Sequence, residues 1–317
     1  EKVRFAKNGT DVTSAAVRLA RAYTGRDKMI VCGYHGWQDW YIGTTVRNSG
    51  VPKATSDLSH VWTYNDISSL AKLFQEYPDK IAAVILEPMN VTEPLPGFLE
   101  EVKALTHKHG ALLIFDETIT GFRYAIGGAQ QHFGVTPDLA TFGKGIANGY
   151  PVSAVVGRAD VMQLMEEIFF SFTFSGETLS LAAALATMQK LEREPVTDTL
   201  YKQGRKVIDG LKTRIAAAGA EDFLGTAGNP TWNFFLIKDT ANYSQWQIKT
   251  LFLQEMFARG ILTIGTHNMS YSHTDADLDK LFNAYDEVIP MLVEGVRGNK
   301  FESMLRCQPL EPLFKVR

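Results

Sequence analysis

The sequence has 317 residues, of which 45% are hydrophobic, and its 32 basic and 35 acidic residues leave a net charge of −3. This content suffices for a large core or two domains, and the charge balance excludes a broad basic face for nucleic acid. Two distant cysteines, Cys32 and Cys307, form no disulfide framework or zinc site, and no apolar run could span a bilayer, so we expect a cytoplasmic protein.

The first part of the chain alternates short apolar runs with amphipathic segments. The runs predicted to be strands are 29–33, 82–88, 111–117, 139–143 and 153–157. Segment 97–110 places Leu99, Val102 and Leu105 at helical spacing before a glycine. This alternation predicts an α/β fold with a mostly parallel sheet covered by helices, in which ligands bind at the carboxyl ends of the strands.

The pattern changes near residue 190. A long amphipathic helix is predicted within 193–219, followed by a strand at 232–237 and helices over 246–259 and 274–295, with a short apolar run at 261–264. We therefore expect a large domain over residues 1–190 and a smaller α+β domain over 191–317.

Asp116 ends the very apolar run 111–117, where a carboxylate is costly unless it has a partner. A helix cap or a buried salt bridge would explain a single aspartate in this place. A more specific hypothesis is a counter-ion for the protonated pyridine nitrogen of pyridoxal phosphate, which makes that ring an electron sink.

Lys144 stands between Gly143 and Gly145, directly after another predicted strand. A lysine in a glycine-rich loop is commonly solvated or in contact with phosphate, although this loop lacks the spacing of a P-loop. Together with Asp116, one β-unit upstream, it fits a lysine that forms a Schiff base with the cofactor. The two glycines would then leave room for the cofactor.

A phosphate-binding turn is predicted where Gly9 and Thr10 open an amphipathic helical segment, although an ordinary helix cap would also explain these residues. Tyr34 follows the first predicted strand and could stack on a planar ring or simply occupy a turn. We interpret the adjacent His35 as a structural histidine and not as a catalytic base.

Six segments together carry a resemblance to a known family. They are 8–28, 33–40, 84–89, 112–123, 137–158 and 173–192. In order and spacing they resemble the class III, fold-type I pyridoxal-phosphate aminotransferases, and most of all the glutamate-1-semialdehyde aminomutase-like branch. A non-catalytic relative and a nucleotide-binding enzyme are the alternatives; intact Lys144 and Asp116 disfavour the first, and the lack of a G-x-G-x-x-G motif disfavours the second.

The resemblance implies a role for individual residues. Lys144 would form the Schiff base, Asp116 would pair with the pyridinium, Gly9 and Thr10 would hold the phosphate, and Tyr34 and Thr118 would contact the two ring faces. Thr173 would reach the phosphate of the partner subunit, which implies an obligate homodimer with a shared site. Glu87 is implied only as a residue near the site.

The departures from the family concern the substrate. Position 118 holds threonine where an aliphatic residue is usual, and the last third of the chain offers His267 and Asn268 where the family has a glutamate or an arginine. We hypothesise a sugar-like or polyol-like carbonyl acceptor, with turn residues as the alternative interpretation of this pair. Because the sequence opens at Glu1 within a folded-looking segment, we also expect that an N-terminal segment is missing.

These observations predict a pyridoxal-phosphate aminotransferase acting on a small-molecule amino donor and a carbonyl acceptor. Aminomutases, racemases and decarboxylases of the same fold would use the same Lys144 and Asp116, so they remain alternatives.

Overall fold

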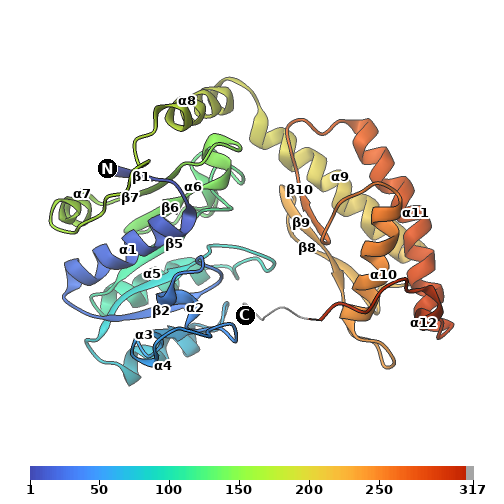
Figure 1. The fold of residues 1–317 in the computed structure, drawn as a ribbon, viewed down its shortest axis with the longest axis horizontal. Coiled ribbons are helices and arrows are strands. Elements are labelled where there is room, and N and C mark those ends of the chain that lie inside the picture. The colour runs from blue at the N-terminus through green and yellow to red at the C-terminus, as the bar shows by residue number, and fades with distance from the viewer. Residues whose placement is uncertain (312–317) are drawn as a thin grey trace. The chain divides into compact units, whose positions relative to one another are not determined.

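The computed structural model describes residues 1–311, which fold into two compact units. The first spans Glu1–Pro195, and the second begins at Val196 (Figure 1). The division predicted after residue 190 falls inside helix α8 (Thr178–Arg193), which continues until Glu194 and Pro195 separate it from the next helix. Among the helices described, none combines the length and the apolar character needed to cross a membrane.

The first unit is built on a seven-stranded sheet in the order β1-β7-β6-β5-β4-β2-β3. Its strands are β1 (Lys2–Ala6), β2 (Lys28–Cys32), β3 (Ser59–Val61), β4 (Ile81–Leu86), β5 (Leu112–Asp116), β6 (Leu139–Phe142) and β7 (Ser153–Gly157). Strands β2 to β6 are parallel, whereas β7 is antiparallel to both β6 and β1. All five predicted strands are present, and the edge strands β1 and β3 are additions.

Helices cover both faces of this sheet. They are α1 (Gly9–Thr24), α2 (Asp39–Ile42), α3 (Lys53–Ser56), α4 (Ile67–Glu76), α5 (Phe98–Lys108), α6 (Gly128–Phe133), α7 (Ala159–Met162) and α8, with short 3-10 turns η1 (Lys144–Ala147) and η2 (Gln163–Glu166). Alternate residues of one strand enter different cores: Met29 and Val31 pack with α1, whereas Ile30 and Cys32 pack with α4 and α5. A sheet buried on both faces explains why its strands are continuously apolar.

The second unit packs helices on a small antiparallel sheet in the order β10-β9-β8. Its elements are α9 (Val196–Ala217), β8 (Leu224–Asn229), β9 (Trp232–Ile237), α10 (Gln245–Ala258), β10 (Thr266–Asn268), α11 (Asp275–Arg297) and α12 (Phe301–Met304). The apolar run 261–264 is a loop in which Leu262 is 91% exposed, and the strand pairing occurs later, between Thr266–Asn268 and β9. Apolar composition alone therefore did not identify the paired residues.

Candidate active site

A cavity of about 650 Å³ opens in the first unit, at the carboxyl ends of its parallel strands. The predicted residues that line it are Gly9, Thr10, Tyr34, Glu87, Asp116, Thr118 and Lys144. They lie at the carboxyl ends of β1, β2, β4, β5 and β6 or in the segments that follow, because the sheet topology brings these strand ends to one edge. Seven residues that are scattered along the sequence thus share one concave site.

Asp116 is the last residue of β5 and lies at the base of this cavity, only 4% exposed. Its Oδ2 is 2.9 Å from His35 Nδ1, and its Oδ1 accepts from the Thr141 hydroxyl and the Thr118 amide, each at 3.1 Å. Burial by itself would raise the pKa of this carboxyl, but the hydrogen bond and charge of His35 bring it below its ordinary value. Asp116 is therefore held as a carboxylate.

His35 contributes more than the structural role assigned to it from the sequence. Its Nε2 is 3.2 Å from the carbonyl oxygen of Cys32, while Nδ1 faces Asp116. The Asp116 carboxylate can only accept a hydrogen bond, so Nδ1 donates to it. His35 is thus the buried hydrogen-bond partner of Asp116; no spacing rule links the two, which are 81 residues apart.

Lys144 begins the turn η1 and has a φ of 41°, a strained conformation for a residue with a side chain. It is exposed and lines the cavity. A Cβ at Gly143 would lie 3.2 Å from Thr118 Cγ2, so a glycine here allows the backbone to lie close to the Thr118 side chain. A Cβ at Gly145 would meet only a carbonyl oxygen at 3.6 Å, so crowding does not require glycine there. Such strain is typical of functional positions.

The turn before α1 has the features of a phosphate-binding site. The Thr10 hydroxyl is buried and has no hydrogen-bond partner among the described residues. The capping box of α1 is formed by Asn8 and Asp11, whose carboxylate accepts from the Asn8 backbone amide at 3.0 Å, so the Thr10 hydroxyl takes no part in it. A Cβ on Gly36, whose φ is +100°, would lie 2.4 Å from Thr10 Oγ1, which explains the glycine there. A helix N-terminus with an orphaned hydroxyl fits the phosphate of the expected cofactor.

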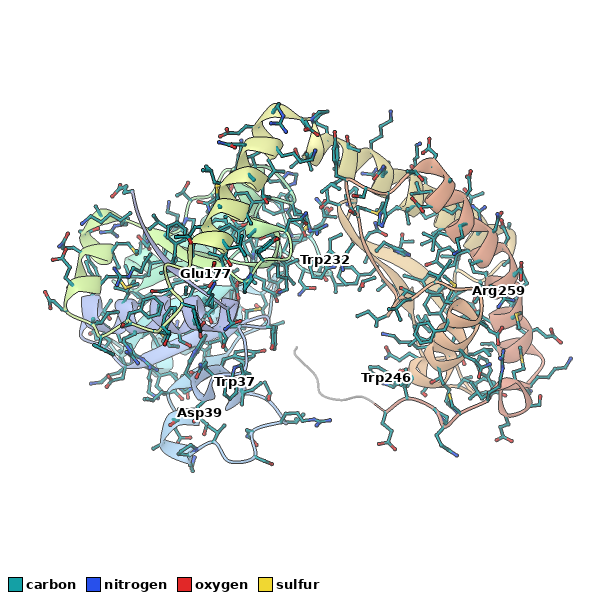
Figure 2. The ribbon with its side chains drawn as sticks, turned by 45° about the horizontal axis from the view of Figure 1, so that its top comes forward. Trp37, Asp39, Glu177, Trp232, Trp246 and Arg259 are labelled. Atoms are coloured by element: carbon teal, nitrogen blue, oxygen red, sulfur yellow. The ribbon has the colours of Figure 1, made fainter. Side chains whose placement is uncertain are left out.

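Glu87 fixes the backbone that carries Tyr34. The carboxylate is 4% exposed and accepts from the Tyr34 amide at 2.9 Å and from the Asn90 side chain at 3.0 Å. The Tyr34 ring is 41% exposed at the cavity and packs against the edge of Tyr41, with ring centroids 5.6 Å apart. Trp37 lines the same cavity and is 68% exposed (Figure 2). Its aromatic character was not identified as a site feature from the sequence.

Three predicted site residues do not line this cavity. Thr173 is exposed in the turn at 173–176 that precedes α8. His267 and Asn268 belong to the second unit and border a separate cavity of about 440 Å³ there. His267 is buried, with Nδ1 2.8 Å from Asn233 Oδ1 and Nε2 2.6 Å from the Tyr285 hydroxyl. Burial lowers the pKa of His267 to about 4, so it is a neutral residue within a polar network at neutral pH.

Comparisons with known proteins agree with this geometry. The family model for class-III aminotransferases matches residues 1–268. The chain is 36% identical to a 3-aminobutyryl-CoA aminotransferase of Cloacimonas acidaminovorans (strain Evry), over 88% of this chain and 68% of the relative. It is also 36% identical to the glutamate-1-semialdehyde 2,1-aminomutase 2 of Brevibacillus brevis, over 90% of this chain and 72% of the relative.

Solved structures give the same result for the fold. The FumI protein of Sphingopyxis sp. MTA144, solved in its PLP internal aldimine form, superimposes with a TM-score of 0.86 and 28% identity, covering 98% of this chain and 73% of FumI. An omega-transaminase of Sphaerobacter thermophilus gives a TM-score of 0.84 and 26% identity, covering 93% of this chain and 75% of that protein. The predicted fold-type I architecture is therefore confirmed.

The buried carboxylate, the strained lysine and the orphaned hydroxyl all fit pyridoxal 5′-phosphate, and the relatives confirm the predicted enzyme class and its cofactor. The relatives include both aminotransferases and aminomutases. The chain belongs to the class-III aminotransferase family, whose members are pyridoxal-phosphate enzymes.

Proposed function

We propose that this chain transfers an amino group from an amino-acid donor to a carbonyl acceptor, with Lys144 and Asp116 as its catalytic residues. The observation that carries the proposal is the placement of a strained, accessible lysine in the same cavity as a buried carboxylate paired with His35. An aldehyde-bearing cofactor requires an amine that can bond to it, and a pyridine ring requires an anion near its nitrogen.

When bound, pyridoxal phosphate supplies an electron sink that stabilises negative charge developing at the α carbon of the substrate. Lys144 Nζ would hold the cofactor, and as a free amine it would be the group that accepts the proton from the substrate α carbon. Asp116 stays ionised because its pKa is lowered, so it can hold a proton on the ring nitrogen. His35 prevents Asp116 from drifting or taking up that proton itself.

The remaining residues hold and orient the cofactor. The backbone amides at Gly9 and Thr10 and the unpaired Thr10 hydroxyl would bind the phosphate. Tyr34, fixed through Glu87, would stack on one ring face, and Thr118 would contact the other. Thr173 would act on the partner's phosphate, because it is exposed and does not line the cavity of its own chain. The enzyme would be a cytoplasmic homodimer with shared active sites.

The acceptor is proposed to be a sugar-like or polyol-like carbonyl compound. His267 already uses both ring nitrogens, so Asn268, exposed at the end of β10, is the group of this pair that is free to meet a substrate hydroxyl. The second candidate is an aminomutase reaction, which the aminomutase relatives at 36 to 37% identity support. Assays of keto-sugars with L-glutamate, beside glutamate-1-semialdehyde alone, separate the two reactions.

The first test is an absorbance spectrum of the protein with pyridoxal phosphate, before and after addition of L-glutamate, beside a Lys144→Ala variant. We expect a visible band that requires Lys144 and that changes to the spectrum of the amine form of the cofactor when the donor is added. A band that ignores every amino donor would favour a sister reaction of the same fold. Absence of the band from a folded, dimeric protein would refute the proposed role of Lys144.

A further inference from the structure

Lys7 lines the active-site cavity and directly precedes the phosphate-binding turn. Its Nζ donates to Glu177 Oε2 at 3.0 Å and to the Ser180 hydroxyl at 3.2 Å. The Lys7 side chain is 16% exposed and that of Glu177 is 31% exposed. A charge-assisted hydrogen bond between partly shielded groups is stronger and better defined than an ordinary surface ion pair.

Glu177 is itself fixed at the start of α8 (Figure 2). It accepts from the amides of Leu179 and Ser180, at 2.6 and 3.1 Å, and from the Ser180 hydroxyl at 2.6 Å. The Ser180 hydrogen bond and, after it, that of Lys7 lower the pKa of Glu177 to about 2. Glu177 is therefore an anion at physiological pH, and it directly follows the turn that contains Thr173.

The other end of the link is equally constrained. Lys7 lies between Ala6, the last residue of β1, and Asn8, the residue before α1. The carbonyl oxygen of Asn8 accepts from the Ser153 hydroxyl at 2.9 Å, which ties the turn to β7. A displacement of the start of α8 would therefore be transmitted through Glu177 and Lys7 to the backbone of Gly9 and Thr10.

We propose that Lys7 is a positioning residue whose ion pair with Glu177 couples the phosphate-binding turn to the turn carrying Thr173. The inference rests on the proposed role of Thr173 at the partner's phosphate. If the phosphate-binding turn acts in its own subunit and the Thr173 turn acts in the partner, the ion pair makes the ordering of one turn favour the ordering of the other. Cofactor binding and subunit association then strengthen each other, as linkage requires.

A direct contact between Lys7 and the phosphate is the competing explanation, and it makes a different prediction. A purely electrostatic contact would be lost in Lys7→Met but kept in Glu177→Gln, since the lysine remains and its competing anion is removed. A positioning pair is broken equally by either substitution, and the double variant is no worse than either single variant. Glu177→Gln keeps one carbonyl oxygen, which can accept from the Leu179 amide or the Ser180 amide but not from both, and it removes the negative charge that holds Lys7.

The experiment titrates the apoprotein forms of wild type, Lys7→Met, Glu177→Gln and the double variant with pyridoxal phosphate, followed by absorbance. Sedimentation velocity of each, with and without cofactor, gives the subunit affinity. Lys190→Met is the matched control, because it removes a lysine of α8 whose Nζ is 2.6 Å from Glu194 on the exposed surface. Thermal unfolding of each variant verifies that it is folded.

We expect each single variant and the double variant to bind the cofactor about tenfold more weakly, which is the loss of one charge-assisted hydrogen bond. Their subunit affinity should respond less to the cofactor, and the control should match wild type. Weak binding in Lys7→Met alone, or unchanged binding in every variant, would overturn the coupling while leaving the proposed function intact. A wild-type protein that binds no cofactor would instead refute both.

Discussion

At the residue scale, the site depends on how one buried charge is compensated. Asp116 is 4% exposed, and an isolated carboxylate at such a depth would take up a proton. His35 prevents this by donating from Nδ1 at 2.9 Å, while its other nitrogen lies 3.2 Å from the Cys32 carbonyl oxygen. The carboxylate is thus kept ionised and in a fixed orientation, which is the state that a counter-ion for a ring nitrogen must have.

Replacing Asp116 with asparagine tests this function separately from folding. The amide oxygen can still accept from Thr141, and the amide NH2 can donate to Nδ1 of a neutral His35, so the cavity and cofactor binding should survive. It carries no charge, so turnover should fall by about a hundredfold or more. Single-turnover kinetics beside a cofactor titration measures both quantities, and nearly normal turnover would refute the counter-ion role.

His267 gives a prediction about stability and pH. Burial lowers its pKa from the ordinary 6.5 to about 4, so the unfolded chain takes up the proton before the folded chain does. Stability is therefore complete above about pH 6.5 and is lost as the pH falls toward 4, by about 2 kcal/mol between pH 7 and pH 5. Urea unfolding of wild type and His267→Gln should give a flatter dependence in the variant.

The control for this measurement is His132→Gln, because His132 is exposed in α6 and lies in the other unit. It should preserve the pH dependence of the wild type. An equally steep dependence in His267→Gln would assign the effect to other titrating groups.

At the element scale, a buried carboxylate organises the loop between β5 and α6. Glu117 accepts from the Thr120 hydroxyl at 2.6 Å and from the amides of Ala129 and Gln130 at 2.7 and 2.9 Å. Burial raises its pKa despite these donors. The loop that follows Asp116 is therefore held in place by Glu117, the next residue, through contacts with the start of a helix ten or more residues later.

Two glycines, one at the start of α6 and one just after its end, allow the cost of backbone strain to be measured apart from the cost of close packing against Glu117. Gly128 and Gly134 both have a positive φ, +77° and +72°. A Cβ on Gly128 would lie 2.5 Å from Glu117 Oε2, whereas one on Gly134 would meet no atom within 4 Å. We expect Gly134→Ala to cost about 1 kcal/mol of stability and Gly128→Ala about 2 kcal/mol more. Chemical denaturation measures both, and equal costs would show that the Glu117 contact adds nothing.

At the scale of the whole molecule, the shared site can be tested by mixing subunits. Lys144→Ala and Thr173→Ala should each be nearly inactive alone. If Thr173 serves the partner, a hybrid dimer holds one site with both native residues, so an equimolar exchanged mixture should recover about a quarter of wild-type sites. If Thr173 acts within its own chain, no hybrid site is intact and mixing restores nothing.

Much of the fold follows from local pattern. Continuous apolar runs predicted five of the seven strands of the large sheet, because strands buried on both faces are mostly apolar. The edge strand β1 was not predicted, since its residues are largely exposed and their apolar character is weak. Chain order and spacing also identified the enzyme class, with Asp116 as the last residue of one strand and Lys144 two residues after the end of the next.

By itself, the sequence determined the enzyme class and supplied the candidate groups Lys144 and Asp116, because residue types and their order along the chain are local information. Only the tertiary structure decided how those groups are supported. The Asp116–His35 pair and the Lys7–Glu177 link join residues 81 and 170 positions apart, and no local periodicity encodes such distances. It also placed His267 in an internal network of the second unit. Burial and contact across the chain, which are properties of the packed molecule, determine those partners and their charges.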